Sequence, residues 1–324
     1  MAQASTLYAN RLRLELIARN RLYALGRAHV ESYGGIPVIV YAPEGERHGN
    51  FFDSAYAAIL ANPGWAQRFS KIHAQAAHTL PSAERRWREL DSSMSSDALL
   101  MNIFCAPGVA DSPLVRRALG VDDDAVPLFG WKARVPLGNG RFDRTEVDMR
   151  LGTLLVEAKL TENDFQTRAA PMVECYRDFD AVFERDLLPR CTIAIARPRR
   201  AGEFAENYSQ EFESLLGDPG SFSTIDPVVP APGVPGYAGY QLIRNVLAAH
   251  ATGGSFCVLH DGRRPDLREA WFRVIAAVKC AELRIRLKVL TWQELAAYLC
   301  EDLQKFLDLK YGIVAPGKAP SPVG

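Results

Sequence analysis

The chain has 324 residues and a formal net charge of zero, because 38 basic residues balance 38 acidic ones. A hydrophobic fraction of 48% and a charged fraction of 23% are ordinary for a globular protein. This length allows one large domain or two modest ones, and the balanced charge leaves room for phosphate contacts concentrated in one cleft.

Several protein classes have no support in the sequence. There is no apolar run of about 18 residues, and the N-terminus has no apolar stretch, so we expect neither a membrane span nor a secretory signal. The 6 cysteines are widely spaced without a Cys-x-x-Cys pair. That spacing argues against a zinc site or a disulfide framework and favours a cytoplasmic protein with reduced thiols. The sequence contains no Walker A, G-x-G-x-x-G or G-x-S-x-G pattern. It therefore gives no indication of an ATPase, a dehydrogenase or an α/β-hydrolase.

Residues 1–80 are predicted to form a helical region packed on the core. Apolar periodicity predicts helices over residues 6–30, 51–60 and 65–77, with an extended segment at Ile36–Tyr41. The histidines of this region show no metal-ligand spacing, so we expect no chemistry from it.

Residues 81–312 show the element order of one α/β domain. A helix over residues 82–89 precedes a helix Ala98–Cys105, which Ser96 or Asp97 is expected to cap. Three strands follow as an antiparallel meander, at about residues 128–135, 144–151 and 154–160. The later predicted elements are a helix at 171–187, a strand at 191–197, a helix at 240–250, a strand at 255–260, a helix at 266–280 and a strand at 287–290.

The remaining predictions concern the less regular parts of this domain. An insertion over about residues 198–237 holds a short helical piece, 208–216, and a Pro/Gly-rich loop, 227–236. Thr291 and Glu294 have the spacing of a capping box at the start of the last helix. A flexible tail is expected over residues 313–324.

The stretch Arg144–Thr161 is predicted to be a hairpin that turns at Gly152-Thr153. Glycine at the first position of a two-residue loop suits a type II′ turn. That turn sets the register, because Leu151 must then face Leu154. One face of the hairpin is expected to be apolar and to carry Val147, Met149, Leu151, Leu154, Val156 and Ala158.

The polar face of this hairpin brings carboxylates together. In the predicted register Asp148 lies across from Glu157, and Glu146 lies across from Lys159. Facing like charges are destabilising, so either one acid stays protonated or a divalent cation lies between them. The alternative is a plain cross-strand ion pair of Glu146 and Lys159 on a solvated face.

Asp148 followed by Glu157-Ala158-Lys159 on the next strand resembles the PD-(D/E)xK nuclease superfamily, whose core runs helix, strand, strand, strand, helix, strand. Over about residues 90–300 the chain is also similar to the PGN_0703-like restriction-endonuclease-like group. That similarity is carried by Ser95-Ser96, Asn102-Ile103-Phe104, Glu146-x-Asp148, Leu155–Lys159 and Tyr240–Asn245. Two positions depart from these patterns: Val147 replaces the leading Pro, and Asp97 stands where the group has Gln.

The resemblance implies a restriction-endonuclease-like α/β core, a mixed sheet of an antiparallel meander plus later strands, flanked by helices with an N-terminal helical layer. It also implies a Mg²⁺-dependent (or Mn²⁺-dependent) nuclease acting on DNA in restriction or phage defence. Asp148 and Glu157 would bind the ion with the backbone carbonyl of Ala158, since hard oxygen ligands suit it. Lys159 would orient the attacking water and add positive charge. Glu146 is a further metal-ligand candidate.

Nucleic acid is the expected partner, with no membrane contact and a homodimer as a candidate state. Gln241, Arg244 and Asn245 are spaced i, i+3 and i+4, so one helical face could present all three to a phosphate. The alternative for them is an ordinary polar helix face. Glu89 or Asp97 is a less favoured additional ligand. Two other functions stay open: a catalytically silent nuclease-like nucleic-acid-binding or assembly module, and a metal-dependent hydrolase of a small substrate.

Overall fold

A five-stranded mixed sheet forms the centre of the computed structural model, which describes residues 2–32, 36–71, 87–121, 125–194 and 233–319. The strand order is β14-β13-β9-β8-β5. Adjacent strands are antiparallel from β5 to β9 and parallel from β9 to β14. The bounds are β5 (Leu128–Lys132), β8 (Glu146–Leu151), β9 (Leu154–Lys159), β13 (Ser255–His260) and β14 (Leu287–Thr291). The predicted α/β fold with a mixed sheet is confirmed.

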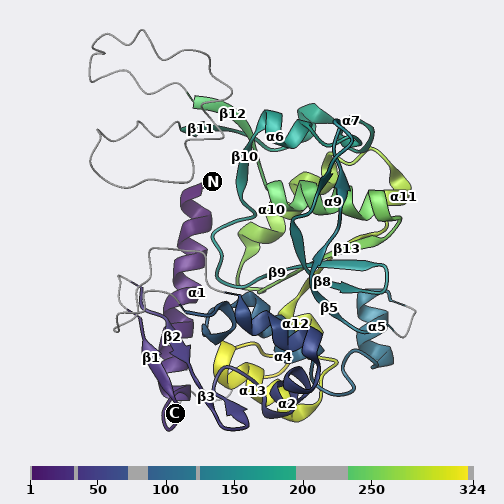
Figure 1. The fold of residues 1–324 in the computed structure, drawn as a ribbon. Coiled ribbons are helices and arrows are strands. Elements are labelled where there is room, and N and C mark those ends of the chain that lie inside the picture. Colours follow the sequence, from purple (N-terminus) through teal and green to yellow (C-terminus); the bar gives the residue numbers. More distant parts are fainter. Residues whose placement is uncertain (1, 33–35, 72–86, 122–124, 195–232, 320–324) are drawn as a thin grey trace, which may run out of the picture.

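Helices cover both faces of this sheet (Figure 1). The first core lies on the face covered by α2 (Asp53–Ala61), α4 (Ser96–Phe104), α12 (Trp292–Ala296) and α13 (Glu301–Tyr311). The second core lies on the face covered by α9 (Tyr240–Thr252) and α10 (Pro265–Ala276). Because β9 is central in the sheet, all of its residues are buried. Strand β8 instead alternates between buried and half-buried residues.

The first and last helices of the chain, α1 (Ala2–Tyr23) and α13, pack together on the first core. Leu12 and Leu16 of α1 are buried in that core. The predicted N-terminal helix is too long, because the backbone turns at Gly26 with φ 74° and His29–Glu31 pairs as β1 with β2 (Ile39–Tyr41). Ile313 and Ala315 are also buried, so the chain stays packed beyond the point where the tail was predicted to begin.

Capping residues in the sequence predicted two helix starts to within two residues of their observed positions. Thr291 and Glu294 form the predicted capping box. Helix α4 begins at Ser96, two residues earlier than expected, because Ser95 caps it: the Ser95 hydroxyl accepts the Ala98 backbone N–H at 3.0 Å. The other short elements are β3 (Pro43–Glu44), β4 (Arg47–His48), α3 (Pro63–Ala66), the 3-10 helices η1 (Gln67–Ser70) and η2 (Glu89–Asp91), α5 (Pro113–Leu119), β6 (Val135–Pro136), β7 (Phe142–Asp143) and α11 (Ala281–Arg284).

Tertiary pairing overrides two sequence predictions after the hairpin. The single helix predicted over 171–187 is three short pieces, because Tyr176 and Phe183 each form an isolated β-bridge with a distant residue. Gly233–Ala238 is strand β12, not loop, since it pairs between two other strands. The elements concerned are β10 (Thr167–Ala169), α6 (Ala170–Glu174), α7 (Phe179–Val182), the 3-10 helix η3 (Arg185–Leu187) and β11 (Arg190–Ala194).

Some predictions fall outside the described residues: residues 72–77 of the helix at 65–77, residues 82–86 of the helix at 82–89, most of the insertion with its helical piece 208–216, and the last residues of the tail. Within the described part of the chain, every helix is too short or too polar to cross a membrane.

Candidate functional site

The predicted hairpin is present, and its register is confirmed where the strands pair. Gly152 has φ 57°, and Leu151 lies opposite Leu154. The ladder covers three pairs and ends at Met149 opposite Val156. Beyond that point, Asp148 turns its carboxylate toward β9, and its Oδ2 accepts the backbone N–H of Ala158 at 2.7 Å. The side chain of Asp148 therefore takes the place of a ladder partner.

Strand β8 changes orientation at this position. Val147 packs in the second core and Met149 in the first, although residues two apart on a regular strand share a face. The predicted common apolar face is therefore wrong at Val147. The ladder ends before the predicted pairs of Asp148 with Glu157 and of Glu146 with Lys159. Glu146 and Lys159 bind other side chains, so that pair is wrong, whereas Asp148 and Glu157 lie close enough for the charge of Glu157 to raise the pKa of Asp148.

Glu157 is held between a cation and an amide. Lys159 Nζ donates to Glu157 Oε1 at 2.6 Å, and Asn245 Nδ2 donates to Glu157 Oε2 at 2.8 Å. All three side chains are buried. Glu146, in contrast, binds Arg68 Nη1 at 3.0 Å and is 40% exposed. The plain ion pair of Glu146 with Lys159, which the sequence left as an alternative, is thus replaced by two other pairs.

A pocket of about 770 Å³ opens beside these strands. Of the predicted catalytic and nucleic-acid-binding residues, Asp148, Lys159 and Gln241 line it, and so do Glu89 and Asp97, the less favoured candidate ligands. Further polar side chains line it from α1, from the segment after η1 and from the chain that follows β9, namely Arg13, Lys71 and Glu162. Acidic and basic side chains therefore line the pocket together at the edge of the hairpin.

The two pocket residues of the hairpin have shifted titration behaviour. Burial raises the pKa of the Asp148 carboxyl well above its usual value, and the charges of Glu157 and Asp97 raise it further. Burial by itself would lower the pKa of Lys159, but the charges of Glu157, Glu162 and Asp148 outweigh it and raise that pKa. Lys159 therefore keeps its proton at neutral pH and acts as a fixed positive charge rather than as a base.

Asp97 adds a third acid beside this site. It stands in the first turn of α4, and its Oδ2 accepts from Arg68 Nη2 at 2.8 Å and from Lys71 Nζ at 3.1 Å. Burial would raise the pKa of Asp97, but Lys71 and Arg68 outweigh it and lower that pKa. Lys71 also binds Glu89 at 3.0 Å. From the sequence, Asp97 and Glu89 were candidate metal ligands, whereas in the structure both form ion pairs with basic side chains.

The polar face of α9 points toward the strands rather than outward. Arg244 is buried and donates from Nη2 to the backbone carbonyl of Glu146 at 2.8 Å, while Asn245 binds Glu157. Gln241 lies one turn earlier and lines the pocket. The three residues therefore share a helical face as predicted, but Arg244 and Asn245 bind β8 and β9, and of the three Gln241 lines the pocket.

The donors around Asp148 fit a small divalent cation. In the part of the chain that the structure describes, no group of three or more His, Cys, Asp or Glu side chains is arranged to hold a metal ion. A site here would use two carboxylates, Asp148 and Glu157, with the carbonyl of Ala158. Mg²⁺ prefers oxygen donors and keeps several waters, so a small set of protein ligands suits it. Its charge would also offset the acids that raise the pKa of Asp148.

One comparison with known proteins gives a match. A family model described as "Restriction Endonuclease associating with ARP" matches residues 19–312, which include the whole five-stranded sheet and the pocket residues apart from Arg13. No curated protein and no solved structure matches the chain.

Proposed function

Because the chain belongs to the family of restriction endonucleases associating with ARP, we propose that it is a nuclease of the PD-(D/E)xK type that hydrolyses phosphodiester bonds in DNA. The observation that carries this proposal is the gathering of Asp148, Glu157 and Lys159 where β8 and β9 separate beside a pocket. Restriction or phage defence is the process that we propose for it.

Two carboxylates and a carbonyl have the chemistry to hold the ion. Asp148, Glu157 and the backbone oxygen of Ala158 would bind Mg²⁺ or Mn²⁺. When bound, the ion supplies Lewis-acid chemistry that polarises a phosphate oxygen and lowers the pKa of water. Glu146 is bound to Arg68, and we leave it outside the metal site.

The other side chains would orient the reactants. Lys159 stays protonated, so its ammonium group would orient the attacking water and stabilise the charge that develops on the phosphate. Its hydrogen bond to Glu157 holds it at that place. Asn245 holds Glu157 from the opposite side, and Gln241 is the member of its helix that we propose contacts the nucleic acid.

The test is cleavage of plasmid and linear DNA with and without Mg²⁺. We compare the wild type with Asp148→Asn and Lys159→Met, and with matched surface controls on α13, Asp302→Asn and Lys305→Met. Both control side chains belong to exposed residues. We expect the controls to match the wild type, and the two site variants to lose about 100-fold or more, the range for removing one charge-stabilising group. Equal cleavage by all five proteins would contradict the proposal.

The same assay separates the other two functions. Salt-dependent DNA binding by a wild type that never cleaves would indicate the silent binding module. Hydrolysis of nucleotides but not of polymers would indicate the small-substrate hydrolase. We extend the family's described association with ARP to this chain as a proposal, and the homodimer and the cytoplasmic location stay predictions.

A further inference from the structure

Five consecutive backbone carbonyls, beginning with that of Lys159 in the Glu-x-Lys motif, accept hydrogen bonds from side chains of distant elements. Trp292 Nε1 donates to the carbonyl of Lys159 at 2.9 Å. Arg264 donates to the carbonyls of residues 160, 162 and 163 at 3.4, 2.7 and 3.1 Å. Arg13 Nη2 donates to the carbonyl of Thr161 at 2.6 Å. Side chains thus hold this segment, residues 159–163, over its whole length.

The two arginines are themselves fixed. Arg264 is fully buried, and its guanidinium binds both oxygens of Asp266 at 2.9 and 2.8 Å. Arg13 also binds the side-chain oxygens of Asn163 and Asn10, each at 2.9 Å. A planar guanidinium can hold several acceptors in one geometry, which a lysine ammonium cannot do equally well.

The segment that they hold carries a pocket residue. Glu162 Oε1 accepts the Ser96 hydroxyl at 2.5 Å, and Oε2 accepts the Leu160 backbone N–H at 2.7 Å. Glu162 lines the pocket with Lys159, and its negative charge is one of those that keep Lys159 protonated. A shift of this backbone would therefore move both side chains relative to Asp148.

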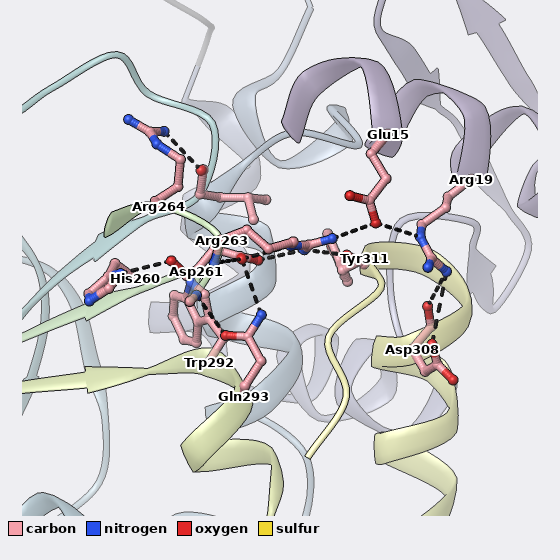
Figure 2. A network of polar contacts seen from close by, with 12 residues as sticks. Glu15, Arg19, His260, Asp261, Arg263, Arg264, Trp292, Gln293, Asp308 and Tyr311 are labelled. Carbon is pink, nitrogen blue, oxygen red and sulfur yellow. Dashed lines mark hydrogen bonds and ion pairs between the residues drawn. The ribbon is translucent and has the colours of Figure 1, made fainter. Parts of the chain in front are cut away.

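Helix α1 is a rigid support for Arg13. Figure 2 shows Arg263 between Asp261, which follows β13, and Glu15 of α1. Arg263 binds the Asp261 carboxylate at 2.6 Å, Glu15 at 2.6 Å and the carbonyl of Tyr311 at 2.8 Å. Arg19, one turn after Glu15, donates to the carbonyl of Asp308 in α13 at 3.0 Å. This network anchors α1 to the end of the sheet.

We propose that Arg13 and Arg264 are positioning residues of the proposed metal centre, which hold residues 160–163 so that Lys159 and Glu162 take their places in the pocket. This inference rests on the proposed function. Two like charges directed at one short segment repel each other, so the arrangement costs energy that a purely structural anchor would not require. Displacements of about 1 Å near reacting groups can cost about 100-fold in rate, which gives such residues a measurable role.

The test uses Arg13, because it is only half-buried and its variants should fold. We compare Arg13→Ala and Arg13→Lys with Arg11→Ala, a matched control that removes an exposed charge from the same helix. For Arg13→Ala we expect kcat for DNA cleavage to fall about 10- to 100-fold with KM changed less than about 3-fold, as for other supporting partners of metal sites. Arg13→Lys should recover part of the loss, and Arg11→Ala should match the wild type.

A second readout needs neither metal nor substrate. Amide hydrogen exchange over residues 160–163 should be at least about 10-fold faster in Arg13→Ala than in Arg11→Ala, since an anchor of this segment is lost. A raised KM with unchanged kcat and a smaller salt slope of DNA binding would overturn the inference and make Arg13 a phosphate contact. Unchanged exchange and unchanged kcat would also overturn it. A wild type that never cleaves DNA refutes the proposed function instead, and exchange still tests the positioning.

Discussion

Variants of Asn245 distinguish most clearly between a residue that positions the metal ligands and one that contacts the substrate. Its helical spacing with Arg244 predicted a contact to nucleic acid, whereas the structure buries it and directs its amide to Glu157 Oε2 at 2.8 Å. Replacing Asn245 with Ala leaves that carboxylate oxygen buried without its donor. Replacing it with Asp places a second carboxyl against Glu157, so one of the two must hold a proton.

The size of the effect follows from this hydrogen bond. A hydrogen bond to a charged group contributes about 1.5–3 kcal/mol, and an unpaired buried group costs a similar amount. Partners that orient metal ligands typically change metal affinity by about 10- to 100-fold. We therefore expect Asn245→Ala to weaken Mn²⁺ binding within that range and Asn245→Asp to weaken it further, with DNA affinity in the absence of metal changed less than about 3-fold.

Isothermal titration with Mn²⁺ and fluorescence anisotropy with labelled DNA measure the two affinities. Gln241→Ala is the matched control, because Gln241 lines the pocket one turn earlier on the same helix. It should weaken DNA binding and leave Mn²⁺ binding unchanged. The reasoning would be refuted if Asn245→Ala kept its Mn²⁺ affinity and lost DNA affinity together with part of the salt dependence.

Three further predictions concern the turn, the metal site and a buried lysine. Gly152→Ala should lower the free energy of unfolding by roughly 1 kcal/mol in a urea titration, because φ 57° is strained for a residue with a Cβ; no change would argue against the turn. The raised pKa of Asp148 makes protons compete with the metal, so the Mg²⁺ concentration for half-maximal cleavage should fall as pH rises; a pH-independent value would contradict this. Burial holds the pKa of Lys310 well below 10.5, so the folded state loses this proton at a lower pH than the unfolded state, and stability contributed by this group rises with pH up to about 10.5. Lys310→Met should therefore flatten the pH dependence of Tm between pH 7 and 10, and an unchanged profile would contradict the assignment.

The centre of the fold could be predicted because its signals are local. A glycine at the first turn position sets the hairpin register, and the structure keeps Leu151 opposite Leu154. The capping box of Thr291 and Glu294 depends on residues three apart and is also present. Spacing along one chain segment thus predicts which residues share an element, although it paired Lys159 with Glu146, whereas the structure pairs Lys159 with Glu157, two residues away on the same strand.

The surroundings of the site could not be predicted because they depend on contacts between distant segments. Arg68 and Lys71 meet Asp97, and Arg13 meets a segment about 150 residues later, with no periodicity in the sequence that connects them. The direction of the polar face of α9 was also open, since spacing shows that Arg244 and Asn245 share a face but not whether it meets solvent or strands. The break in the β8–β9 ladder at Asp148 had no signal in the register argument, which assumes a regular ladder.

A crystal structure of the protein soaked with Mn²⁺, with anomalous scattering recorded for the ion, tests the central claim most directly. The proposal predicts one Mn²⁺ bound by Asp148, Glu157 and the carbonyl oxygen of Ala158, with the Asp148 carboxylate released from the Ala158 N–H. The contradicting result is Mn²⁺ bound only elsewhere, with Asp148 still accepting that N–H and Glu157 still bound by Lys159 and Asn245 alone.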